Sequence, residues 1–156
     1  MATGTWKIYS KAKKYIGAGT ITLGAGVFKM CLLRTSASAA IMVLSTRSVW
    51  SSLSGTEISA RGGYAAGGRN LVPATAQWTA GASAKQWKFT YSTIGLAFTA
   101  SNSALNNIRY CVVRNSTGAG AGKLLMFCTL STAAFTISSP NVLTILPAAT
   151  GCFTLV

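Results

Sequence analysis

The chain contains almost no acidic residue and no histidine, and these absences exclude most kinds of catalytic site. Its 156 residues include a single acidic side chain, Glu57, and no His. A pair of catalytic carboxylates cannot be assembled, and neither can a Ser-His-Asp or Cys-His site. Metal sites with oxygen ligands need several acidic groups, and most zinc sites need His or clustered Cys. We therefore expect a protein that is not an enzyme and that holds no cofactor and no metal.

Long apolar runs are also missing. Every stretch of about 18 residues, the length that a membrane-spanning helix needs, is interrupted by charged or polar residues. The first residues lack the apolar core of a secretion signal. We therefore expect no membrane association. The length fits one domain, residues 1–156, with a core of useful size.

Positive charge, by contrast, is plentiful. Fourteen Lys and Arg side chains give the chain a formal net charge of +13, although charged residues make up only 10% of it. Hydrophobic residues make up 50%, which argues against disorder. Such a surface offers few internal salt bridges and repels copies of itself at low salt. This balance predicts a partner that is an anion or an acidic surface.

Four cysteines lie in apolar, strand-like runs, and no two of them form a Cys-x-x-Cys pair. They are Cys31, Cys111, Cys128 and Cys152. Cysteine is among the residues most often buried, where it behaves as a small apolar side chain. We interpret all four as buried free thiols. A zinc site or a disulfide stays open as the alternative, since an even count does not establish pairing.

The spacing of apolar residues predicts an all-β domain with one short helix near the amino terminus. The helix is expected over 6–16, inside a basic segment 1–19, and Gly17 and Gly19 would end it. Strands are expected at 20–23, 27–33, 69–79, 85–91, 94–100, 107–115, 123–130, 133–138, 141–147 and 151–155. No helical crossover separates the later strands, so the sheets should be antiparallel. The expected architecture is a jelly-roll-like sandwich or a distorted barrel.

Two segments are less regular. Ser36 could cap a short helix that ends at Ala40 or Leu44, and 46–53 predicts a helical turn or an irregular excursion. Residues 60–70 contain two Gly pairs and two Arg, which is typical of a loop because glycine permits positive φ. The wider segment 54–72 is therefore predicted to be a Gly/Arg-rich loop or arm.

Two groups of cations are candidates for contact with the partner. The densest charge in the chain is formed by Lys7, Lys11, Lys13 and Lys14. Arg61 and Arg69 lie on the glycine-rich loop, and arginine can pair with a carboxylate or a phosphate through two hydrogen bonds. The alternatives are a solvated helix face for the lysines and a plain exposed loop for the arginines.

The glycine-rich run 116–123 resembles a phosphate-binding loop only superficially. Thr117 stands where the first glycine of that pattern belongs, and Leu124 replaces the hydroxyl that would hold magnesium. The flanking residues predict strands, whereas a phosphate loop opens a helix. We interpret the run as a hairpin loop.

Aromatic residues offer a second ambiguous pattern. A stacking platform for single-stranded nucleic acid, or a sandwich core, could be formed by Trp50, Trp78, Trp87, Phe89 and Tyr91. Trp87, Phe89 and Tyr91 alternate onto one face of a strand, and we favour the core.

Several segments resemble small structural proteins encoded in the virion modules of tailed bacteriophages. The resemblance is carried by residues 9–17, 20–23, 27–36, 62–71, 108–113 and 143–155. Members of this group carry Asp after the first helix, in a Gly-Asp-Gly-Thr pattern, where this chain has Ala18 and Ala25. The resemblance implies a virion component, such as a protein that decorates and cements the capsid.

The leading hypothesis is therefore a non-enzymatic phage cement protein that binds and stabilises an acidic shell of the major capsid protein. It would be made in the host cytoplasm, act as a dimer or trimer and lie on the capsid surface of the virion. The first alternative is a component of the tail tube or of the head–tail connector, with other virion proteins as partners. The second alternative is a nucleic-acid-binding module, which no recognition motif supports.

Overall fold

The fold is built around one central antiparallel sheet. The computed structural model describes residues 5–37, 48–71, 77–81, 83, 85–92 and 94–155. The strands of this main sheet run in the order β1-β8-β7-β2-β3, and β9 also pairs with β7. Their bounds are β1 Trp6–Ile8, β2 Phe28–Arg34, β3 Arg69–Asn70, β7 Leu105–Asn115, β8 Leu124–Thr129 and β9 Phe135–Ile137.

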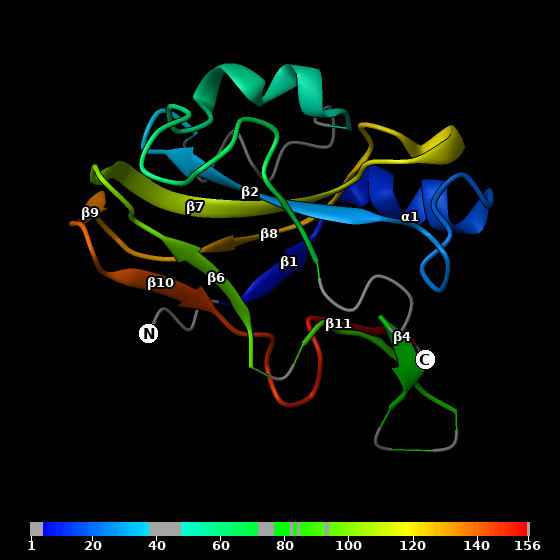
Figure 1. Cartoon of the computed structure of the whole chain (residues 1–156). Coiled ribbons are helices and arrows are strands. Elements are labelled where there is room, and N and C mark those ends of the chain that lie inside the picture. The colour runs from blue at the N-terminus through cyan, green and yellow to red at the C-terminus, as the bar shows by residue number, and fades with distance from the viewer. Residues whose placement is uncertain are drawn as a thin grey trace.

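Further layers cover both faces of the main sheet (Figure 1). Below it in that view lie two small sheets, whose members are β6 Leu96–Thr99 with β10 Val142–Ile145, and β4 Trp78–Ala80 with β5 Trp87–Phe89 and β11 Phe153–Leu155. Above it lie the 3-10 turns Trp50–Ser52 and Ser54–Thr56. All strand pairs are antiparallel, and none of the described sheets closes into a barrel. The predicted all-β sandwich is confirmed.

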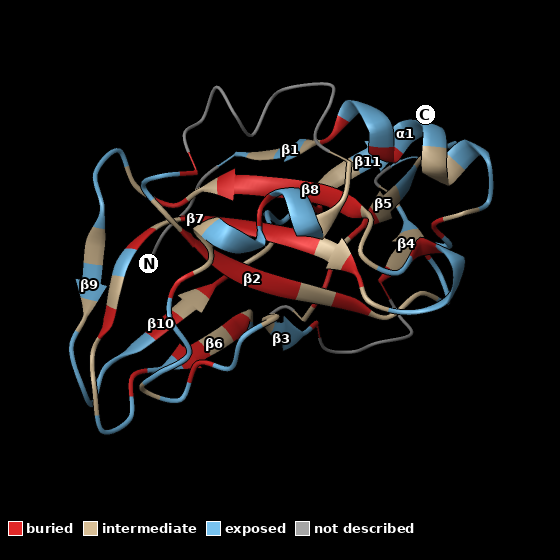
Figure 2. Ribbon diagram, turned by 90° about the horizontal axis from the view of Figure 1, so that it is seen from above, coloured by how far each residue is buried: buried red, intermediate tan, exposed pale blue. Residues whose placement is uncertain are grey.

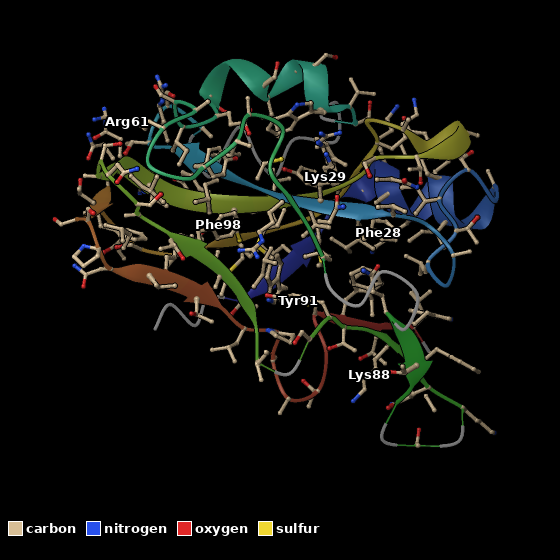
Figure 3. The ribbon with its side chains drawn as sticks, in the orientation of Figure 1. Phe28, Lys29, Arg61, Lys88, Tyr91 and Phe98 are labelled. Atoms are coloured by element: carbon tan, nitrogen blue, oxygen red, sulfur yellow. The ribbon has the colours of Figure 1, made fainter. Side chains whose placement is uncertain are left out.

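Strand β2 shows how the core is divided between the two faces. Phe28 meets Phe89 of β5 below the sheet, with ring centroids 5.1 Å apart, whereas Lys29 lies on the upper side (Figure 3). Because successive side chains alternate, Met30 and Leu32 also face down and Cys31 faces up. Covering both faces buries β2, β7 and β8 along most of their length (Figure 2).

The helix begins later than its sequence pattern predicts. Helix α1 spans Ser10–Gly17, while Trp6–Ile8 forms β1 and pairs with β8. The local pattern at 6–9 was compatible with a helix, but the strand pairing places Trp6 edge-on against Tyr91 at 6.2 Å. Tertiary packing outweighs a weak local propensity.

Two predicted strands are wrong. Residues 20–23 form turns, because the backbone N–H groups of Thr20 and Ile21 donate to the carbonyl of Tyr15 and extend the end of the helix. Of the predicted strand 69–79, the two ends belong to different sheets, as β3 and β4, and residues 72–76 lie outside the described residues. Both errors have one cause, since a short apolar run does not specify its hydrogen-bonding partner.

Strands β5, β6 and β8 to β11 lie inside their predicted ranges, whereas β2 ends one residue later than predicted, at Arg34, and β7 begins two residues earlier, at Leu105. The 3-10 turn Trp50–Ser52 matches the helical turn expected within 46–53. The capped helix expected from Ser36 falls almost wholly on 38–47, outside the described residues. No helix in the described ranges is long and apolar enough to cross a membrane.

Candidate partner-binding surfaces

Three of the predicted lysines lie exposed on α1. Ala12 is fully buried and fixes the inner face of the helix, and Tyr9, just before it, packs on Phe127 of β8 with ring centroids 5.1 Å apart. The exposed outer face carries Lys11, Lys13 and Lys14. Lys14 stands in the last turn, where a cation is favoured by the helix dipole.

Lys7 is exposed on β1, directly before the helix. Lys123 joins the helix lysines from far along the chain, since its Nζ lies 5.0 Å from the ring centroid of Tyr15. We call Lys7, Lys11, Lys13, Lys14 and Lys123 the lysine end. Lys123 could not be singled out from the sequence. Residues 116–123 form the loop of the β7–β8 hairpin, as predicted, and only the folded hairpin places Lys123 beside α1.

The two predicted arginines lie on a loop that is packed down rather than projecting. Within residues 61–70, the glycine loop, Gly62 has φ of 56°, and a Cβ there would stand 2.2 Å from the carbonyl oxygen of Ser103. The carbonyl of Gly62 accepts a hydrogen bond of 2.9 Å from the N–H of Ser101. Tyr64 and Leu71 are buried. Residues 54–71 are therefore packed as a loop, which is one of the two alternatives predicted for 54–72, and they do not project as an arm.

Glu57, the only acidic side chain, holds this loop from inside. Its Oε1 accepts hydrogen bonds from the hydroxyl of Tyr64 at 2.6 Å and from the N–H of Gly67 at 2.8 Å. The Tyr64 hydroxyl accepts in turn from the N–H of Leu32 at 3.0 Å. Burial raises the pKa of Tyr64 above its usual range. The carboxylate of Glu57 is thus hydrogen-bonded to neutral groups of the loop.

Arg61 lines the same cleft as Arg34, which was not among the contact residues predicted from the sequence. A small polar cleft of about 170 Å³, which we call the arginine cleft, is lined by Arg34, Ser59, Arg61, Asn106 and Asn107. Arg34 donates from Nη2 to Ser59 Oγ at 2.8 Å. Arg34 is the last residue of β2, so only the strand pairing shows that it lies near the glycine loop.

Arg69 lies elsewhere. It donates to the carbonyl of Ala97 in β6 and lines a larger pocket of about 400 Å³ together with Tyr64 and Phe98. The six predicted contact residues do not form one patch, because Arg61 lies at the opposite end of the molecule from α1 (Figures 1 and 3). The structure brings together the helix lysines and separates Arg61 from both them and Arg69.

The aromatic residues divide between core and surface. Phe89 and Tyr91 are buried, as favoured by the sequence. Trp87 is 49% exposed and stacks on Trp78, with centroids 6.1 Å apart and planes 16° from parallel. Each ring therefore covers one face of the other. Trp50 lies under the guanidinium of Arg114, 5.3 Å from its centroid.

The cysteines belong to the core, as predicted. All four are free and buried, and Cys111 and Cys128 lie opposite each other on β7 and β8. Burial raises the pKa of Cys31 to about 12 and that of Cys152 above its usual range. No group of three or more potential metal ligands lies together within the described ranges.

No protein-family model matches the chain, and neither a curated protein nor a solved structure is significantly similar to it. The site must therefore be interpreted from its own chemistry. Exposed cations at two ends, with the sole carboxylate turned inward, can attract and hold anionic groups.

Proposed function

We propose that the protein is a capsid-decorating cement protein of a tailed bacteriophage, bound to the acidic outer shell of the major capsid protein. The observation that carries the proposal is the placement of charge. The lysine end and Arg61 expose cations, while Glu57 is bonded to Tyr64 and Gly67 inside the loop. The resemblance of several segments to small phage virion proteins supports the same class of partner.

In this mechanism, charged contacts and apolar contacts contribute to different steps of binding. Exposed lysines attract an acidic shell over a distance and raise the association rate, but they add little affinity each. Buried apolar area supplies most of the binding energy. The exposed apolar side chain of Val142 can supply part of that area. Repetition of sites over a shell adds avidity if the protein is a dimer or trimer.

The fold suits such a role because the cations stand on fixed supports. Helix α1 is anchored by Ala12, and the glycine loop is bonded at both Gly62 and Gly67. A surface that is already in its bound shape loses less conformational entropy on association. Preorganisation therefore lets a small protein bind a shell without refolding.

The test mixes the purified protein with expanded, undecorated heads of the same phage at graded salt and measures occupancy by sedimentation and imaging. Saturable binding at a fixed ratio to the capsid protein is the expected result. Lys13→Glu combined with Lys14→Glu should lower occupancy, and the affinity of this variant should depend less steeply on salt, because fewer attractive charges remain to be screened. The matched control is Lys85→Glu combined with Lys88→Glu, which changes the charge equally around β5.

Three outcomes would reject parts of this proposal. Equal occupancy of the helix variant and the wild type at both low and high salt would remove the lysine end from the interface. Rings or tubes formed by the protein alone, without binding to heads, would indicate a tail-tube or connector component. Tight binding to generic DNA that falls steeply with salt would indicate the nucleic-acid-binding alternative.

A further inference from the structure

The arginine cleft combines features that the lysine end lacks. Its two guanidinium groups come from separate elements, Arg34 from the end of β2 and Arg61 from the glycine loop, yet they line one cavity of about 170 Å³. Like charges in one cavity repel, and the only carboxylate of the chain is bonded elsewhere. The fold therefore holds two cations together without supplying a counterion.

The backbone around the cleft is fixed on three sides. The N–H of Ile58 donates to the carbonyl of Leu32 at 3.1 Å, which ties the segment carrying Ser59 to β2. The turn at Gly62 is bonded to Ser101. Irregular pairing of β7 with both β2 and β9 lies beside the cleft, where Asn107 adopts a positive φ of 60°. Such bulges re-aim side chains and are frequent beside functional sites.

The donors of the cleft are largely free. A guanidinium has five N–H donors, and Ser59 accepts from one nitrogen of Arg34. No partner in the described part of the chain accepts a hydrogen bond from the side chain of Arg61, which is exposed. The amides of Asn106 and Asn107 add neutral donors at the same cavity.

From this arrangement we infer that the arginine cleft is a specific site for a carboxylate group of an acidic side chain on the partner. The assignment of this carboxylate to a capsid subunit rests on the proposed function. The preference of the cleft for a carboxylate is independent of that proposal. Planar guanidinium groups pair with carboxylates through two parallel hydrogen bonds. Phosphate can pair with guanidinium groups in the same way, so inorganic phosphate is the competing ligand in the test; the cleft lies at the end of β2, the start of β7 and the glycine loop, away from the amino terminus of helix α1 that would favour phosphate (Figure 1).

The cleft can be tested without any capsid, using the full chain and two small probes. The probes are acetyl-Gly-Glu-Gly-amide and acetyl-Gly-Gln-Gly-amide, which differ only in the carboxylate. Binding is followed through the side-chain N–H resonances of Arg34, Arg61 and Arg69 by NMR at constant ionic strength. We expect saturable shifts at Arg34 and Arg61 with the Glu probe alone, and none at Arg69.

Variants then separate the shape of the guanidinium from its charge. Arg61→Lys keeps the positive charge but removes the planar guanidinium that donates two parallel hydrogen bonds. The affinity for the Glu probe should therefore fall about tenfold. Arg69→Lys is the matched control on the same loop and should bind as the wild type does. Equal shifts with both probes, unchanged affinity of Arg61→Lys, or preferential binding of inorganic phosphate would each overturn the inference.

The same variants distinguish this inference from the proposed function. If the Glu probe binds and the protein does not attach to heads, the cleft stands and the cement proposal fails. If the protein attaches to heads and Arg61→Lys attaches with equal affinity, the cement proposal stands and the cleft is not its recognition site.

Discussion

The lysine end and the arginine cleft carry the same sign of charge on very different supports. At the lysine end, three of the five cations project from one short helix whose inner face is held by Ala12, and Lys7 and Lys123 flank this helix. At the cleft, Arg34 and Arg61 are placed by β2, the glycine loop and the irregular part of β7. The first arrangement needs little structure, whereas the second depends on close backbone contacts.

This difference separates attraction from recognition. Lysine is a hydrated point charge on a flexible stem, so a helix face of lysines responds to the field of a partner more than to its shape. Arginines fixed in a cleft respond to the position of individual oxygen atoms. A protein with both could approach an acidic surface quickly and then dock in one orientation. Substitutions in the two supports should therefore have unequal effects.

The largest effect is expected from Gly68→Ala, in the glycine loop that carries Arg61. Gly68 has φ of 80°, and a Cβ there would lie 2.2 Å from the carbonyl oxygen of Met30 and 2.6 Å from Cys31 Sγ. The strain and overlap should lower the free energy of unfolding by about 2–4 kcal/mol, which thermal and urea denaturation would measure. If the Gly68→Ala variant melted at the same temperature as the wild type, the glycine loop would be free to move and would not be a fixed support.

A smaller loss is expected from Glu57→Gln. The variant keeps an acceptor for Tyr64 and Gly67 but removes its charge, so the free energy of unfolding should fall by about 1–2 kcal/mol in urea denaturation. The loosened loop should also weaken binding of the Glu probe at the cleft, although the net positive charge has risen. Stronger probe binding would mean that total charge, and not the geometry of the cleft, controls affinity.

Alkaline pH should loosen the glycine loop through Cys31, whose Sγ would lie 2.6 Å from a Cβ at Gly68. Burial raises the pKa of this thiol from 9.0 to about 12, so the unfolded chain releases its proton at lower pH than the folded one. The contribution of the thiol to stability is therefore complete below pH 9 and is lost as pH rises towards 12, by up to about 1.4 kcal/mol per pH unit.

Urea denaturation between pH 8 and 11 checks this expectation. Cys31→Ala should make the alkaline decline shallower, and other buried thiols and phenols account for the remainder. A decline of unchanged slope in this variant would show that Cys31 does not contribute.

The smallest effect is expected at the lysine end, from Gly17→Ala. Gly17 is the last residue of α1, and a Cβ there would meet nothing within 4 Å. Alanine restricts the unfolded chain and favours the helix, so the variant should be more stable by about 0.5 kcal/mol. Binding to heads should not change. If Gly17→Ala lowered the free energy of unfolding as much as Gly68→Ala does, helix α1 and the glycine loop would be equally sensitive supports, contrary to our expectation.

The sequence predicts what depends on local pattern, and it fails where position depends on distant pairing. Alternating apolar residues placed β5, β6 and β8 to β11 within their predicted ranges and β2 and β7 within two residues of theirs, and the glycine pairs at 62–63 and 67–68 indicated a loop with positive φ. The start of α1 was wrong because β8, more than a hundred residues away, recruits Trp6–Ile8 as a strand.

The candidate site divides in the same way. The helix lysines are neighbours in sequence and remain neighbours in the fold. Arg34 was missed because it ends an apolar strand, and only the pairing of β2 with β7 and with the segment carrying Ile58 places it beside Arg61. Arg61 and Arg69 are eight positions apart and line different cavities, because the turns between them reverse the chain.

The burial of the thiols has a consequence for how the protein carries its charge through changes of medium. Histidine is absent, and burial moves the titration of Cys31 and Cys152 away from neutrality. These thiols therefore stay protonated between about pH 6 and pH 8, and no imidazole is present to gain a proton there. A change of association within that range would come from groups other than histidine or these two thiols, of which histidines on the partner are the first to examine.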